Sequence, residues 1–159
     1  MFLRRLFVAL VALAPLVAMA ADRGTAKGKI TINGKPKDLA YAYAWKDGAN
    51  TTVLLSTAKL DKKVLGDRFA LIDLAREDKF TGVQATITPK GEVETGTFYT
   101  AAENGYFDAV GMHTWKKKTQ SPKEIAGKLS TDHEGHFFKT SYAYNAEFQA
   151  PIGPQPKKK

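Results

Sequence analysis

The sequence predicts a mainly β protein, either an antiparallel β-sandwich or a small β-barrel of about eight strands with one short helix. Three observations lead to this prediction. Apolar and polar residues alternate along most of the chain, Asn-Gly pairs and a Thr-Pro-Lys-Gly tetrapeptide separate the alternating stretches, and the connections are short. Short connections join antiparallel neighbours. With 159 residues, 43% of them hydrophobic, the chain is long enough for one domain with a packed core.

The N-terminus predicts a cleaved signal peptide over residues 1–20. Arg4 and Arg5 precede an apolar stretch at 6–17, and Ala-Met-Ala at 18–20 is a small-x-small cleavage motif. The apolar stretch is shorter than the roughly 20 residues that a membrane span needs, so we expect no transmembrane segment after cleavage. The protein is therefore expected to be periplasmic or secreted, with a mature chain that starts at Ala21.

The mature chain is expected to form a single β-rich domain over residues 21–152, followed by a disordered Pro/Lys tail over 153–159. The chain contains no cysteine, which excludes disulfides, thiolate metal sites and a cysteine nucleophile. Its formal net charge is +8, and three lysines that end the tail contribute to it. The composition indicates a small, basic domain that needs no cofactor to fold.

The first part of the domain predicts three strands, at 29–32, 39–45 and 52–57. The Asn-Gly pair at 33–34 favours a tight type I′ turn between the first two. The second strand has bulky residues on one face and alanines on the other, so we expect both faces to be covered. Its bulky residues would either line a ligand cavity in a barrel or fill a sandwich core: Leu39, Tyr41, Tyr43 and Trp45.

The period then changes and predicts the one helix. Asp67 is a suitable N-cap, and apolar residues between Phe69 and Ala75 follow at helical spacing. Alternation resumes afterwards and predicts five more strands, at 83–87, 93–100, 106–115, 125–131 and 141–150.

Three segments together resemble a group of uncharacterised exported bacterial β-rich domains. These segments are GKITINGK at 28–35, GVQATITPKGEV at 82–93 and YAYNAEFQAPI at 142–152. The resemblance implies an envelope or secreted location and a β-rich fold. It assigns no catalytic or binding residues to this chain.

Four side chains within five residues form the best candidate for a metal site: Asp132, His133, Glu134 and His136. Imidazole and carboxylate groups bind zinc, copper or nickel, and His113 would have to complete the set. A solvated loop explains the same residues and is the favoured interpretation. Likewise, a histidine on an apolar strand face is more often a hydrogen-bonded core residue than a ligand.

A second candidate site is a basic patch in which Trp115 precedes Lys116, Lys117 and Lys118. Aromatic and lysine side chains together can bind nucleic acid, but an exported protein rarely meets it, so no nucleic acid is expected. The expected partner is an unknown envelope component, with anionic lipids, lipopolysaccharide phosphates, acidic polysaccharides and acidic proteins as candidates. Lysines that protect a strand edge explain the same pattern.

Catalytic motifs for nucleophilic attack or phosphate binding do not occur in the sequence, which predicts that the protein is not an enzyme. The leading hypothesis is therefore a non-enzymatic binding or interaction module of the cell envelope. The alternative is a small-ligand or metal carrier with a β-barrel cavity. A metal-assisted hydrolase built on the histidine cluster ranks third.

Overall fold

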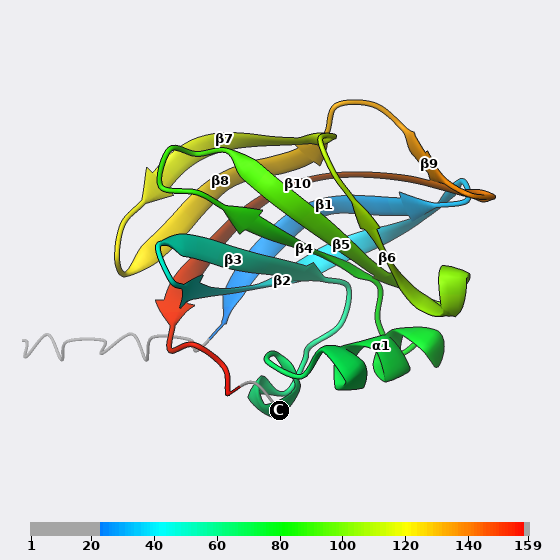
Figure 1. The fold of residues 1–159 in the computed structure, drawn as a ribbon, viewed down its shortest axis with the longest axis horizontal. Helices are drawn as coiled ribbons and strands as arrows, with labels where there is room; N and C mark the ends of the chain where they lie inside the picture. The colour runs from blue at the N-terminus through cyan, green and yellow to red at the C-terminus, as the bar shows by residue number, and fades with distance from the viewer. Residues whose placement is uncertain (1–22, 158–159) are drawn as a thin grey trace, which may run out of the picture.

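The computed structural model describes residues 23–157, so the predicted signal peptide lies outside the described residues. The described residues form one curled, largely antiparallel sheet of ten strands with one α-helix, α1 (Arg68–Arg76), below it (Figure 1). The mainly β prediction is confirmed. The strands are β1 (Gly24–Ile32), β2 (Lys35–Asp47), β3 (Asn50–Ser56), β4 (Gly82–Ile87), β5 (Val93–Thr100), β6 (Gly105–Ala109), β7 (His113–Gln120), β8 (Glu124–Thr131), β9 (Gly135–Phe137) and β10 (Thr140–Gly153).

The strand order in the sheet is β6-β5-β4-β3-β2-β1-β10-β8-β7, and β9 pairs with β10. Every pairing is antiparallel except a short parallel contact between the end of β10 and β2. The sheet curls into a half-barrel with β6 and β7 as its edges (Figure 1). The finer expectation, a β-sandwich or a small β-barrel of about eight strands, is not confirmed, because the described residues form one curled sheet of ten strands.

Two differences raise the strand number from about eight to ten. The stretch 106–115, expected as one strand, is broken into β6 and β7 by a turn in which Gly111 has φ of 75°. Glycine adopts this backbone conformation without the steric cost of a side chain. The short strand β9 was not expected at all. By contrast, the predicted turn between β1 and β2 is confirmed, since Asn33 and Gly34 have φ of 50° and 72° as a type I′ turn requires.

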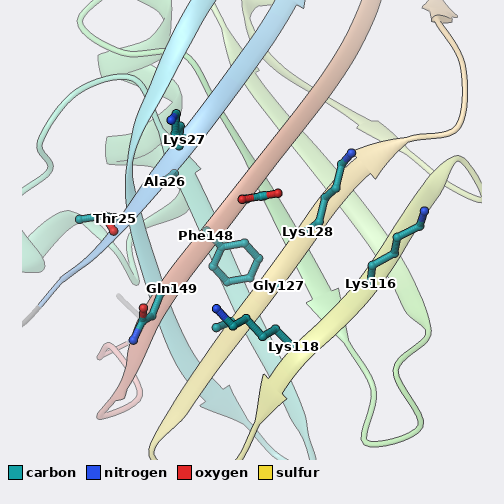
Figure 2. Close-up of a pocket in the computed structure, with 11 residues that line it drawn as sticks. Thr25, Ala26, Lys27, Lys116, Lys118, Gly127, Lys128, Phe148 and Gln149 are labelled. Atoms are coloured by element: carbon teal, nitrogen blue, oxygen red, sulfur yellow. The ribbon is translucent and has the colours of Figure 1, made fainter.

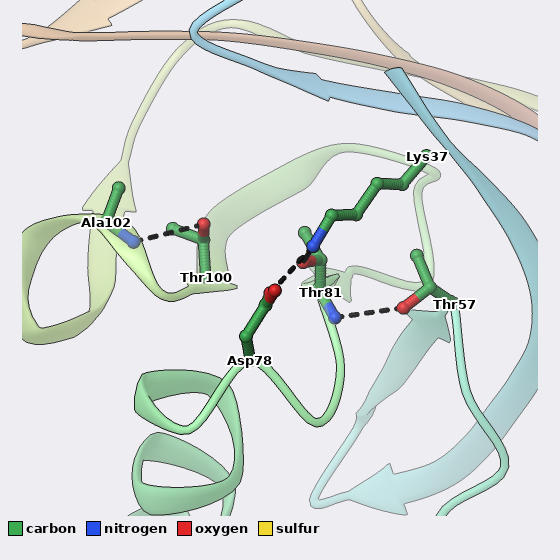
Figure 3. Close-up of polar contacts among 6 residues, drawn as sticks. All are labelled: Lys37, Thr57, Asp78, Thr81, Thr100 and Ala102. Carbon is green, nitrogen blue, oxygen red and sulfur yellow. Dashed lines mark hydrogen bonds and ion pairs between the residues drawn. The ribbon is translucent and has the colours of Figure 1, made fainter. Parts of the chain in front are cut away.

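The predicted helix is also confirmed. The Asp67 side chain accepts a hydrogen bond of 3.0 Å from the backbone N–H of Ala70 and so caps α1. Asp78, the residue after the C-cap of α1, forms an ion pair of 2.7 Å with Lys37 of β2 and so links the helix to the sheet (Figure 3). Two hydrogen bonds nearby, Thr81 N–H to Thr57 Oγ1 at 2.9 Å and Ala102 N–H to Thr100 Oγ1 at 3.3 Å, fix the flanking loops.

The two faces of the sheet bury two separate hydrophobic clusters. The concave face is filled by side chains from both halves of the sheet, with Phe98 stacked on Phe107 at 5.0 Å and 4.7 Å from Tyr142 between ring centroids. The convex face of β2–β5 is covered by α1 and the segment before it. Tyr43 and Trp45 belong to this outer cluster, whereas the alanines between and before them face the concave side.

The open side of the half-barrel is bridged by side chains and not by backbone pairing. His113 of β7 lies 3.1 Å from the carbonyl oxygen of Ala109 in β6, through its Nε2. At the other end of β7, the Gln120 amide donates a 3.1 Å hydrogen bond to the carbonyl oxygen of Thr88. These two contacts hold β7 against β6 and against the residue that follows β4, and we call this junction the seam.

The C-terminal segment runs from β10 to the turn before α1 (Figure 1). Gln155 donates a 3.0 Å hydrogen bond to Asp47, and Pro156 lies directly against Gly66. Residues 155–157 thus contact the domain at the turn before α1.

Candidate functional site

The structure does not bring the predicted metal ligands together. His133 and His136 are exposed on the loop around β9, where His136 Nε2 lies 3.8 Å from Glu134 Oε1. Asp132 instead accepts a hydrogen bond from the hydroxyl of Thr114. Within residues 23–157, no three histidine or carboxylate side chains are placed to hold a metal ion.

His113 points into the concave core, away from the loop histidines. Its Nε2 lies 3.1 Å from the Ala109 carbonyl, which can only accept, so the neutral ring carries its proton on Nε2. Its Nδ1 then accepts a 3.0 Å hydrogen bond from the hydroxyl of Tyr144. Burial lowers the pKa of His113, and the bond to the carbonyl opposes this effect in part. His113 is thus a neutral structural residue of the seam.

The structure separates the residues of the predicted basic patch. Trp115 turns inward, with its ring centroid 5.4 Å from that of Phe148, and lies over Gly127, where a Cβ atom would overlap the indole. Lys116 and Lys118 turn to the convex face of the sheet and line an open groove there. Lys117 is exposed but does not line this groove.

Alternation along β7 places Lys116 and Lys118, which are two residues apart, on one side of the sheet. The register between β7 and β8 shifts between Lys117 and Thr119, so Lys118 is the extra residue of a bulge. A bulge breaks the alternation of the side chains that follow it. Gln120 accordingly lies with Trp115, whose indole N–H donates a 3.4 Å hydrogen bond to it, although strict alternation would place Gln120 with Lys116.

Two lysines that are remote in sequence complete the site. Lys27 of β1 and Lys128 of β8 join Lys116 and Lys118 around a groove of about 720 Å³ (Figure 2). We call these four residues the lysine groove. Strands β1, β10, β8 and β7 are neighbours in the sheet, which brings together residues more than 100 positions apart.

Three of these lysines and one glutamate form a row across the four strands. Glu147 of β10 stands directly opposite Lys27 on one side and Lys128 on the other, and Lys128 stands opposite Lys116. Neighbouring strands are about 4.8 Å apart, so the row spans about 14 Å. Like charges on directly opposite residues destabilise a sheet, by up to about 1 kcal/mol. The Lys116–Lys128 pair thus carries a cost in stability.

None of the four lysines forms an ion pair or side-chain hydrogen bond with another residue in the described part of the chain. Nearby lysines of the same sheet behave differently. Lys29 binds Asp38 at 2.7 Å, as Lys37 binds Asp78. The lysine groove therefore presents four ammonium groups against one carboxylate, which is an arrangement suited to anions.

Comparison with protein-family models, curated proteins and solved structures finds no match to this chain. In the part that the structure describes, no helix is long and apolar enough to cross a membrane.

Proposed function

We propose that this chain is an exported, non-enzymatic binding module of the cell envelope that holds an anionic ligand in the lysine groove. The observation that carries the proposal is the directly opposed, unpaired Lys116–Lys128 pair. Glu147 opposite Lys128 offsets this cost only in part, and a local arrangement that costs stability is typical of a functional site. Export rests on the leader with its small-x-small cleavage motif.

The expected ligand is a glycan that carries repeated phosphate or carboxylate groups. Lysine ammonium groups are compact point charges that bind either type of anion without a fixed orientation. The groove is open and extends over four strands, which fits a chain of anionic units better than one small molecule. Exposed charge pairs contribute about 0.2–1 kcal/mol each, so binding depends on several contacts at once and weakens with salt.

The curled sheet binds its ligand on the convex face and not on the concave face. Side chains bridge the seam, and aromatic rings fill the concave face. A carrier with a cavity between the inner faces of a barrel is therefore a weaker candidate. A hydrolase is weaker still, because the histidines and carboxylates that it needs stand apart.

Charge reversal tests the proposal. The double variant Lys116→Glu/Lys128→Glu is compared with Lys117→Glu, which changes an exposed neighbour outside the groove. The probes are polygalacturonate, polyphosphate and neutral dextran, in titrations by calorimetry at low and at physiological ionic strength. We expect the double variant to weaken binding of the charged probes by about tenfold or more, and Lys117→Glu to weaken it about twofold or less.

Two results would contradict the proposal. One is binding of dextran as tight as that of the charged polymers. The other is an equal loss of binding in Lys117→Glu and in the double variant, which would show that net charge and not the groove matters.

A further inference from the structure

A second cavity, of about 150 Å³, lies on the other half of the convex face. Its floor consists of outward-facing residues of β2–β5, its wall is the start of α1 with the residues before it, and Gln155 and Pro156 of the C-terminal segment border it. The floor residues are Trp45, Thr52, Gln84, Thr86, Thr97 and Tyr99. This cavity shares no residue with the lysine groove.

Five of the six floor residues carry polar side-chain atoms that bind to nothing else in the described protein, and the sixth, Thr97, donates a 2.6 Å hydrogen bond to Asp108. Trp45, Thr52 and Tyr99 are only 7%, 3% and 2% exposed, yet none of them forms a side-chain hydrogen bond. The same holds for the side chains of Gln84 and Thr86. Unpaired polar atoms in such buried residues are costly unless a ligand or water satisfies them.

These polar atoms are open to solvent or to a ligand. Among the described residues, no side-chain nitrogen or oxygen atom is both fully enclosed and without a hydrogen-bond partner. The indole N–H of Trp45 and the hydroxyls of Thr52 and Tyr99 have no partner, so each must touch open space. Trp45 stands opposite Thr52, and Thr52 stands opposite Thr86, so these three groups form one row across the cavity floor.

The lining is close to electrically neutral. The guanidinium of Arg68 forms an ion pair of 3.3 Å with Asp108 and lies over the Tyr106 ring, 4.7 Å from its centroid. Asp47 is the one carboxylate of the lining, against the one guanidinium of Arg68, and it accepts a hydrogen bond from Gln155. Burial raises the pKa of Tyr99 to about 12, so its hydroxyl keeps its proton and remains a donor.

We infer that this cavity binds a small, neutral, polyhydroxylated molecule, of the size of a single sugar ring. Threonine and tyrosine hydroxyls and a glutamine amide each donate and accept, and sugar hydroxyls do the same. Aromatic Trp45 and Tyr99 supply apolar surface beside them. The volume is below the 300–1,000 Å³ of pockets for drug-sized ligands, which restricts the occupant to a small molecule.

The test follows the indole N–H signal of Trp45 in nuclear magnetic resonance spectra of the exported chain. The chain has two tryptophans, so the variant Trp115→Phe identifies the Trp45 signal. The probes are glucose, N-acetylglucosamine and glucuronate, each added up to its solubility limit. We expect glucose or N-acetylglucosamine to shift the Trp45 signal with saturation, and glucuronate to bind no more tightly than glucose.

Isosteric variants locate the binding. Thr86→Val and Gln84→Met each remove one hydrogen-bonding group from the floor, and each is expected to weaken binding by about two- to tenfold. The matched control is Thr95→Val, because Thr95 stands opposite Thr86 in the same row but is exposed and lies outside the cavity. It should leave binding unchanged.

Three results would overturn the inference. The first is a Trp45 signal that none of the sugars moves, which would show that water alone fills the cavity. The second is tighter binding of glucuronate than of glucose, which would assign the cavity to anions. The third is equal weakening by Thr95→Val and Thr86→Val.

Discussion

Gly96 of β5 allows the seam to close, and replacing it with alanine should destabilise the protein strongly. An added Cβ atom would overlap the imidazole of His113, which lies directly against Gly96. The ring would have to move, and its hydrogen bonds to the Ala109 carbonyl and the Tyr144 hydroxyl would break. The variant Gly96→Ala therefore tests the seam with a single methyl group.

The expected cost follows from the groups that lose their partners. A net hydrogen bond contributes about 1 kcal/mol, and a buried polar group without a partner costs about 1–3 kcal/mol. The hydroxyl of Tyr144 is such a group, because Tyr144 is 3% exposed and its hydroxyl binds only His113 among the described residues. We expect Gly96→Ala to lower the free energy of unfolding by about 2–4 kcal/mol.

Urea unfolding, followed by circular dichroism, measures this loss. The control is Gly153→Ala near the end of β10, where a Cβ atom would meet only the Ala44 carbonyl oxygen at an ordinary 3.5 Å. It should change the free energy of unfolding by less than about 0.5 kcal/mol. If Gly96→Ala were no more destabilising than Gly153→Ala, the seam contact would be refuted.

Three further predictions address other parts of the fold. Burial lowers the pKa of folded His113 below its ordinary 6.5, so the unfolded chain takes up its proton at a higher pH than the folded chain. The free energy of unfolding should therefore fall as the pH drops from 6.5 through that lower pKa. His113→Gln should lose this pH dependence in urea titrations. Lys37→Ala breaks the exposed ion pair with Asp78 and the 3.2 Å hydrogen bond to Thr81 Oγ1, so thermal unfolding should show a loss of about 1 kcal/mol. Gly66→Ala should displace Pro156, which limited proteolysis would detect as faster cleavage of the C-terminal segment; cleavage as slow as in the unchanged chain would contradict this contact.

Local patterns in the sequence predicted the parts of the fold that depend on local chemistry. The alternation in β10 placed Tyr142, Tyr144 and Phe148 on one face, and all three are buried. The cap at Asp67 and the turn after Asn33 follow from a side-chain oxygen and from a tolerated positive φ. Each of these features depends only on residues close together in the sequence, so a local sequence pattern is sufficient to predict it.

The lysine groove could not be predicted in the same way. Lys27 and Lys128 meet only because β1 and β8 both pair with β10, and alternation does not specify which strands pair. The bulge at Lys118 also moved Gln120 to the side of Trp115, which strict alternation did not assign to it. The sequence therefore indicated Lys116 and Lys118 as candidates but placed Lys117 and Trp115 with them.

Binding of an anionic glycan across β1, β10, β8 and β7 would change the surroundings of the backbone amides in these strands. Nuclear magnetic resonance maps the amide shifts on addition of polygalacturonate. We predict that the largest saturable changes fall at Lys27, Lys116, Gly127 and Lys128, and that salt reverses them. Changes centred on α1 or on the loop around β9, with the lysine groove unmoved, would contradict the account.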